Sequence, residues 1–268
     1  MNQRSHRAAA ACVGLLLGAT GLVGAAPPDD ATSTAPPPLP NPGPRALAMY
    51  ALGPAMRPRP TVACDPLSWL GVSRCEYKLV KRGKAGATVA QTMQTVEAGW
   101  RRNRLDLVVE HLQLDASGNL VMSESHDLDN ELIIRFVKPV VVMPAVLEPG
   151  KLVASESRIE IFRQDKPTKR IDHGTCRMTV VYDADQTLAV PAGRFDCRRI
   201  NMACSARFGM GAMQTETTLY CTPKVGVVAE HYAERGRIFI LPHGVKRTII
   251  LSQAPDDDAS QVAEAPSP

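Results

Sequence analysis

The chain of 268 residues carries a formal net charge of +4 at pH 7, and 44% of its residues are hydrophobic while only 4% are aromatic. So small a positive charge excludes a strongly basic nucleic-acid-binding domain. The scarcity of aromatic rings also leaves few platforms on which a sugar could stack.

Residues 1–26 have the pattern of a secretory signal peptide. Arg4 and Arg7 form a short basic head, followed by a run of Ala, Leu, Val and Gly and by small residues at the end. A transmembrane helix needs about 20 predominantly apolar residues, so a membrane anchor is the less favoured alternative. Cys12 lacks the preceding Leu of a lipoprotein signal. We therefore predict export to the periplasm, where removal of the two arginines leaves a net charge of +2.

Two further segments are expected to lie outside the folded domain. Residues 27–60 are rich in Pro, Ala, Thr, Ser and Gly, as in STAPPPLPNPGP. Because proline fixes the backbone and removes an amide donor, we expect an extended, unpacked linker there. Residues 254–268 lack an apolar pattern and are predicted to be a disordered acidic tail. Residues 61–253 then form a single β-rich domain.

This domain is predicted to be mainly β. Short segments rich in branched aliphatic residues recur at 104–115, 132–137, 158–162, 177–183, 215–221, 226–232, 237–241 and 246–251. The turn signals between them are DASG, EPGK, DADQ, PAG, GMGA and ERG. About ten to thirteen strands at this spacing indicate a curved antiparallel sheet or a partly closed barrel, with at most one or two short helices.

Two segments fit this pattern less well. Residues 84–100 contain good helix formers, but their Thr and Val positions alternate, so we predict a strand. Residues 64–75, CDPLSWLGVSRC, could form one helical turn with Asp65 as the N-cap and Pro66 at the first position. A disulfide between Cys64 and Cys75 would then close a small loop.

Six cysteines follow the leader, which in an exported chain indicates disulfides. They are Cys64, Cys75, Cys176, Cys197, Cys204 and Cys221. No pair has CxxC spacing, which argues against a redox motif or a zinc ribbon. Sequence alone does not choose the pairing. The preferred hypothesis is sequential, 64 with 75, 176 with 197 and 204 with 221, because the last two pairs flank the DADQ and GMGA turns.

Two stretches, VPAGRFDC and LYCTPKVG, are predicted to break strands. Pro191 cannot donate to a sheet ladder, and Gly193 can adopt a positive φ, so the chain should bend there. Phe195 is then expected to anchor the core just after the bend. Pro223 and Gly226 have the same breaking roles in the second stretch. A catalytic loop is the alternative, and sheet punctuation is favoured.

The two stretches also carry a family resemblance. TVVYDADQTLAVPAGRFDCRRI and TLYCTPKVGVVAEHY, together with MPAVLEPGK at 143–151, resemble the TapB-like group of exported bacterial β-rich proteins of unknown function. The resemblance covers about Met143 to Leu251. It implies a curved sheet of the lipoprotein-carrier kind, and it supplies no catalytic residues. The cysteine density and the long proline-rich leader depart from the pattern of the group.

Catalytic signatures are absent from the sequence: there is no GxSxG, HExxH, GxxxxGK[ST] or GxGxxG. SESHDLD, residues 123–129, places Ser125, His126, Asp127 and Asp129 together. Neighbours on a strand point to opposite faces, however, whereas a catalytic triad converges from separate elements. An exposed polar strand end is therefore the favoured interpretation.

Metal, cofactor and sugar chemistry have weak support. The histidines show no short spacing, and the methionines around a glycine turn could hold copper(I) but are also common core residues. These residues are His111, His126, His173, His231, His243, Met178, Met202, Met210 and Met213. A glycosidase needs two converging carboxylates, which sequence cannot show for the scattered Glu156, Glu160, Glu216, Glu230 and Glu234. We predict no metal, cofactor or catalytic residue.

Three functional hypotheses follow. The favoured one is a non-enzymatic exported domain that binds a lipid, another apolar ligand or a cell-envelope protein in the concavity of its sheet, with peripheral membrane contact and no nucleic acid. The second is a periplasmic hydrolase whose residues converge only in the fold, for which a pocket with a paired His and carboxylate would be the sign. The third is a structural scaffold of an envelope assembly, marked by a large exposed apolar patch.

Overall fold

The structure is a computed structural model, and it describes residues 43–60, 65–71, 74–82, 84–209, 211–223, 225–238 and 241–253. Within these residues there are two short helices and thirteen strands. In chain order they are η1 (Arg45–Tyr50), β1 (Ala51–Met56), α1 (Pro66–Leu70), β2 (Cys75–Lys81), β3 (Lys84–Val96), β4 (Gly99–Arg104), β5 (Val108–Leu114), β6 (Leu120–Asp127), β7 (Leu132–Met143), β8 (Leu152–Arg163), β9 (Lys166–Val190), β10 (Gly193–Phe208), β11 (Gly211–Thr222), β12 (Gly226–Ile238) and β13 (Leu241–Leu251).

The strands form one antiparallel sheet that closes on itself. Its order is β9-β10-β11-β12-β13-β2-β3-β4-β5-β6-β7-β8, and β8 pairs back onto β9 to complete a ring of twelve strands. The thirteenth strand, β1, pairs with the last part of β9, because β9 is 25 residues long and β8 covers only its first part. The expectation of a mainly β fold with one or two short helices is therefore confirmed, and the barrel is closed.

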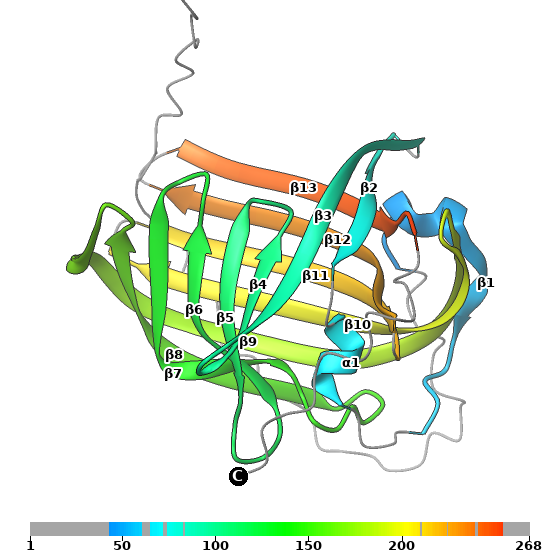
Figure 1. The fold of residues 1–268 in the computed structure, drawn as a ribbon, viewed down its shortest axis with the longest axis horizontal. Coiled ribbons are helices and arrows are strands. Elements are labelled where there is room, and N and C mark those ends of the chain that lie inside the picture. The colour runs from blue at the N-terminus through cyan, green and yellow to red at the C-terminus, as the bar shows by residue number, and fades with distance from the viewer. Residues whose placement is uncertain are drawn as a thin grey trace, which may run out of the picture.

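The ring is flattened into two layers, as Figure 1 shows. Strands β9 to β13 form one layer, and the strands from β3 to β7 cross them at a steep angle. Alternating residues of both layers meet in one apolar core that includes Leu112, Met122, Met178, Ile200 and Ile249.

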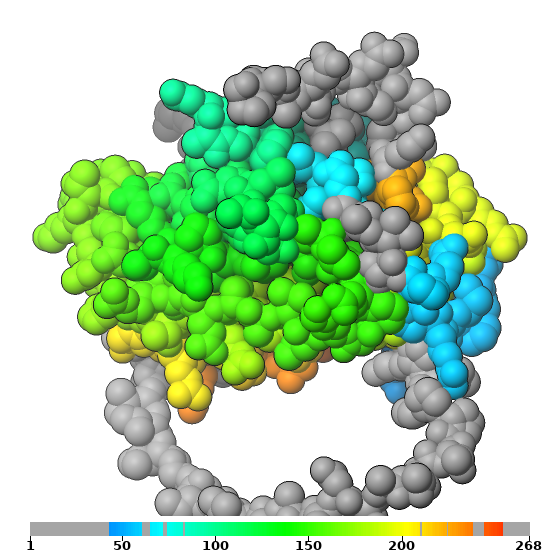
Figure 2. Space-filling model, turned by 90° about the horizontal axis from the view of Figure 1, so that it is seen from below, coloured from blue at the N-terminus to red at the C-terminus, as the bar shows by residue number. Residues whose placement is uncertain are grey.

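The N-terminal part of the described chain packs on the barrel. Leu47 in η1 is 1% exposed and belongs to the core, and β1 pairs with Leu188 and Thr187 of β9. Arg59 also donates to the buried carboxylate of Asp185 at 2.6 Å. Figure 2 shows this blue segment against one end of the molecule. The predicted linker is therefore wrong for residues 43–60, while residues 27–42 lie outside the described residues.

Two predicted turns are parts of strands. DADQ lies inside β9, where the pairing shifts from Ala184↔Arg199 to Tyr182↔Ile200 and leaves Asp183 as the extra residue of a β-bulge. ERG lies inside β12, which is paired on both sides there. The reverse error occurs at 237–241, predicted as one strand, because β12 ends at Ile238 and β13 begins at Leu241.

The sequential disulfide pairing is wrong for Cys176 with Cys197 and for Cys204 with Cys221. Cys197 pairs with Gln186, ten positions along β9 from Cys176, which is roughly 33 Å of strand. Cys204 and Cys221 are likewise separated along the β10–β11 ladder. Cys75, Cys176, Cys197 and Cys204 are free thiols, and the Sγ atoms of Cys176 and Cys204 lie 3.3 Å apart. Cys64 lies outside the described residues.

The helix cap predicted within 64–75 is confirmed, whereas the strand predicted at 84–100 is confirmed only up to Val96. Helix α1 begins at Pro66, and the Asp65 carboxylate accepts a hydrogen bond from the Leu67 amide at 3.1 Å. Residues 84–96 form β3, and a turn then leads into β4 at Gly99. Both predictions depended on short-range chemistry, which long-range packing did not override.

VPAGRFDC and LYCTPKVG both lie at hairpins. Pro191 and Ala192 form the turn between β9 and β10, with Gly193 at φ 134°. Phe195 packs, partly buried, against the main core. Pro223 lies in the turn after β11, and Gly226 starts β12 at φ 85°. A Cβ on Gly226 would lie 2.5 Å from the backbone nitrogen of Gly71, so this glycine lets β12 approach the end of α1.

Candidate functional site

Backbone pairing in the ring is incomplete between β7 and β8, as it also is between β13 and β2, whose ladder runs only from Ile249↔Leu79 to Leu251↔Tyr77. The β7–β8 ladder runs from Leu132↔Arg163 to Phe136↔Ile159 and ends there, and we call the unpaired part beyond it the seam. Beyond this point β7 also shifts its register against β6, and Pro139 has no amide hydrogen to donate. The strand β7 therefore leaves β8 at this point, while it resumes pairing with β6 from Val140 to Met143.

Two serine hydroxyls bridge the open seam. The amide of Lys138 donates to Ser157 Oγ, and the amide of Val141 donates to Ser155 Oγ, both at 3.0 Å. Ser157 in turn donates to the Arg158 carbonyl at 2.7 Å. The serine hydroxyls are the acceptors for these two β7 amides in place of backbone carbonyls. The carbonyls of an incoming extended chain could therefore replace the serines and form ordinary strand pairing with β7.

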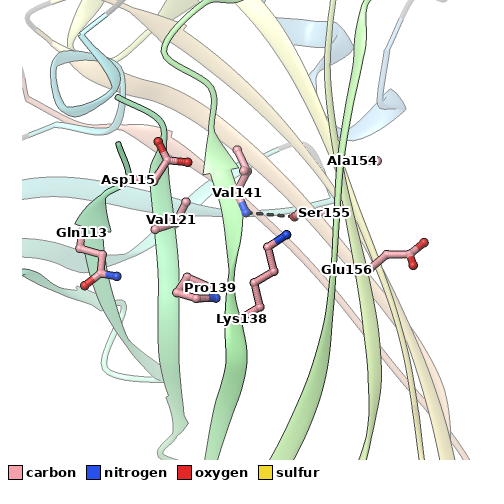
Figure 3. Close-up of a pocket in the computed structure, with 9 residues that line it drawn as sticks. All are labelled: Gln113, Asp115, Val121, Lys138, Pro139, Val141, Ala154, Ser155 and Glu156. Atoms are coloured by element: carbon pink, nitrogen blue, oxygen red, sulfur yellow. Dashed lines mark hydrogen bonds between the residues drawn. The ribbon is translucent and has the colours of Figure 1, made fainter. Parts of the chain in front are cut away.

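A groove of about 410 Å³ lies over this seam (Figure 3). It is lined by Gln113, Asp115, Val121, Lys138, Pro139, Val141, Ala154, Ser155 and Glu156. Charged and polar groups from the end of β5 and from β7 and β8 thus share the lining with a larger apolar part. This composition differs from the purely apolar concavity expected for a lipid carrier, and it suits an amphipathic ligand.

The charges around the groove differ in how firmly they are held. Weak burial disfavours ionisation of Asp115, but hydrogen bonds from Asn119 and Ser117 outweigh it and lower the pKa of this carboxyl. The side chain of Lys138 extends between β7 and β8 (Figure 3) and forms no ion pair with a described residue. Lys138 is therefore the cation of the groove that a ligand carboxylate could approach.

A second groove, of about 310 Å³, lies over β9 to β12 and includes the predicted residues Glu216 and His231. Arg199, 1% exposed, forms a bidentate pair with Asp183 at 2.8 and 2.9 Å in this groove. His231 Nδ1 lies 2.8 Å from Thr248 Oγ1. Burial and the nearby Lys246 lower the pKa of His231, so its ring is mostly neutral at pH 7.

Inside the barrel, a buried ionic network links the two layers. Arg104 of β4 donates to both oxygens of Glu230 on β12 at 2.7 Å and to Glu110 at 3.1 Å. Arg102 pairs with Glu110 at 2.5 Å, and Arg247 lies 3.6 Å from Glu230. Burial opposes the ionisation of Glu110, but the two arginines beside it lower its pKa. Sequence gave no sign that these scattered residues converge.

SESHDLD covers the end of β6 and the start of the following turn. Successive residues of the strand point to opposite faces. Ser125 pairs with Glu110, which faces the interior, whereas Glu124 and His126 face outward. Asp127 accepts hydrogen bonds from Asn130 in the next turn. The structure brings His111, fifteen residues earlier, beside His126. Spacing rules within one strand could not detect this cross-strand pair.

The methionines do not gather into one site in the described part of the chain. Met178 and Met202 pack against the core. Met210 lies outside the described residues, so the copper hypothesis stays untested. No helix among the described residues has the length and apolar character that a membrane span requires.

Comparisons with known proteins give little further information. No family profile and no curated protein matches the chain. Each of three solved structures aligns with 70% of it. A Bacteroides fragilis protein, presumed to be exported and described as YmcC-like in fold, has 10% identity, 97% coverage and a TM-score of 0.35. A Parabacteroides distasonis protein, presumed to be a lipoprotein, has 11%, 98% and 0.32, and the hypothetical lipoprotein YmcC of Escherichia coli has 9%, 89% and 0.34.

Likenesses at these TM-scores carry no argument about the function of this chain. The resemblance to the TapB-like group likewise stays a prediction, because no family profile supports it. The functional argument therefore depends on the geometry of the chain itself.

Proposed function

We propose that this protein is a non-enzymatic, exported β-barrel domain that binds an extended segment of a cell-envelope protein at the seam between β7 and β8. The observation that carries the proposal is the interrupted ladder beyond Phe136↔Ile159. Strand edges without a ladder are the usual sites at which an extended peptide adds to a sheet. The leader-like residues 1–26 support export.

The chemistry of the groove favours a polypeptide over a lipid. A bound strand would gain main-chain hydrogen bonds at β7 or β8 in place of the two serine bridges. Its apolar side chains would contact Val121 and Val141, and an acidic group would lie near Lys138. An acyl chain would leave those polar groups without partners, which costs free energy.

Site-specific photo-crosslinking in producing cells tests this proposal. A photoreactive residue at Ala154 lies in the groove, while the same residue at Ala212 on β11 is a matched exposed control. We expect a polypeptide adduct at position 154, weakened by Lys138→Glu, and none at position 212. A synthetic peptide of the captured segment should bind the purified protein, and Ala154→Trp should block it while Ala212→Trp should not. A lipid adduct, or equal labelling at both positions, would overturn the proposal.

The second groove supports a hydrolase as the alternative function. A half-buried histidine, His231, lines it together with the carboxylates of Glu216 and Asp183, and a hydrolytic site would need one of these carboxylates to pair with the histidine. A panel of fluorogenic esters and phosphates tests this alternative. Turnover that is lost in His231→Ala but retained in His173→Ala would support it, whereas no turnover in the wild-type protein would exclude these substrate classes.

A further inference from the structure

A cluster of nitrogen and oxygen ligands lies on the outer face of β5 and β6. One donor atom each of His111, Glu124 and His126 can be chosen so that all three lie within 4.8 Å of one another. The two imidazole rings have centroids 5.2 Å apart and are tilted by 34°. All three side chains are half-buried, so an ion could reach them from solvent.

The backbone explains why these residues meet. His111 pairs directly with Glu124, and His126 lies on the same face two positions further along β6. The register then shifts after His111, so that Leu112 pairs with Met122 and Ser123 is the extra residue of a bulge. Bulges re-aim side chains, and this one lies directly beside the cluster. The arrangement is therefore a property of two paired strands rather than of a loop.

The donor set matches the preferences of a divalent transition metal. Two imidazole nitrogens and one carboxylate oxygen are common zinc ligands, with bonds of about 2.0–2.2 Å. Tetrahedral geometry then places ligand atoms about 3.3 Å apart, so side-chain rotations of an ångström or so would complete the site. Three protein ligands leave one coordination position open.

Arg135 of β7 holds the carboxylate in place. Its Nε donates to Glu124 Oε2 at 2.6 Å, which leaves Oε1 directed at His126 Nε2 at 2.5 Å. Arg135 is itself fixed by the Pro167 carbonyl at 3.0 Å and by the ring of Phe162, 4.5 Å away. Ligand carboxylates in metal sites have outer hydrogen-bond partners of this kind. A metal between Oε1 and Nε2 would take the place of the proton that these atoms share.

We propose that His111, Glu124 and His126 bind one divalent transition metal ion of the zinc class, with a fourth position open. This site goes beyond the peptide-binding function, because it uses a different set of side chains and does not need a partner. It nevertheless lies near the groove: Gln113, which lines the groove, is two residues from His111 on the same face of β5. A bound ion would thus be about 7 Å along the strand from the groove.

Cobalt(II) titration of the full-length protein tests the site, because Co²⁺ reports its ligands through visible absorption. We expect one tetrahedral Co²⁺ with nitrogen and oxygen ligands, no thiolate charge-transfer band, and displacement by Zn²⁺. His111→Ala and His126→Ala should each weaken binding at least tenfold, and Glu124→Gln should also weaken it. His231→Ala, a half-buried histidine on β12, is the control and should bind as the wild type does.

Two results would overturn the proposal. One is unchanged Co²⁺ affinity in a folded His111→Ala or His126→Ala variant, and the other is a thiolate band, which would assign the metal to cysteines. Circular dichroism of each variant identifies any that does not fold. Because the two histidines lie on different strands, either folded variant decides the question.

Discussion

The two layers of the barrel are built differently. The ladder between β9 and β10 runs from Gly193 to the end of β10 with one bulge, and that between β10 and β11 has none. The β11–β12 ladder has one further shift. In the other layer, the β3–β4 and β4–β5 ladders are regular, but the register shifts once between β5 and β6 and twice between β6 and β7, and the β7–β8 ladder stops after Phe136. We call these the regular layer and the irregular layer.

This difference shows where the chain can do more than fold. In a regular ladder, every backbone group and every inward side chain is used by the neighbouring strands. In the irregular layer, the bulge after His111 lies beside the ligand cluster, and the open seam exposes part of β7 and β8. Both proposals therefore concern the irregular layer, and the first three predictions test whether the layers differ in energy as well as in geometry.

The largest expected effect comes from the joint between the layers. Glu230 of β12 neutralises Arg104 of β4, and its side chain is 4% exposed. Glu230→Gln would leave buried arginine charge without its partner, which costs about 3–5 kcal/mol. Urea denaturation should show this loss as a lower midpoint. Glu216→Gln, in a side chain that is 70% exposed, should change the free energy of unfolding by less than about 1 kcal/mol. Equal effects of the two changes would show that the network does not join the layers.

The next effect compares a glycine inside a ladder of the regular layer with a glycine in a turn. A Cβ on Gly174 in β9 would lie 1.9 Å from the Arg207 carbonyl oxygen of the paired strand, so Gly174→Ala must push two backbones apart. We expect a loss of about 1–3 kcal/mol. Gly150, in the turn before β8, has φ +71° and no atom within 4 Å of its Cβ position. Gly150→Ala should cost only its backbone strain, about 1 kcal/mol. If thermal or urea unfolding gave the reverse order, a Cβ inside the β9–β10 ladder would be tolerated better than one in an open turn.

A smaller effect is expected at the seam. Ser155→Ala removes the acceptor of the Val141 amide, and a lost hydrogen bond of this kind costs about 0.5–1.5 kcal/mol. Hydrogen exchange should show faster exchange of the Val141 amide, with the β10–β11 amides unchanged. Ser117→Ala, in the exposed turn between β5 and β6, is the control. Unchanged exchange at Val141 would mean that the serine bridge does not hold the seam.

Sequence predicted the features that depend on neighbouring residues. The cap of α1 at Asp65, the bend at Gly193 and most strands follow from local backbone chemistry. DADQ was misinterpreted because Asp favours turns, and only the shift in the β9–β10 register identifies Asp183 as the extra residue of a bulge. The same residue type is compatible with a turn and with a β-bulge, so the error could not be corrected from the sequence alone.

The candidate sites were beyond sequence for a different reason. The seam depends on where β7 stops pairing with β8, and the closure of the ring on the pairing of β8 with β9. His111 and His126 meet only through the β5–β6 register, and Arg104 reaches Glu230 across the whole barrel. Each of these is a long-range pairing, and a spacing rule within one strand does not contain it. The packing of η1 was missed because the proline-rich composition around Leu47 predicted an unpacked linker, although Leu47 belongs to the core.

The smallest expected effect is the contribution of His231, in the regular layer, to the pH dependence of stability. Burial and Lys246 lower the pKa of His231 below its usual value near 6.5, so the folded state favours the neutral ring. This contribution to stability is present above about pH 6.5 and is lost as the pH falls through the lowered folded pKa. Because the side chain is half-exposed, solvent screening keeps the effect small. Free energies of unfolding measured from about pH 8 to about pH 5 should therefore fall less steeply in His231→Gln than in the wild-type protein. Identical slopes would show that the regular layer leaves His231 as free to take a proton as it is in the unfolded chain.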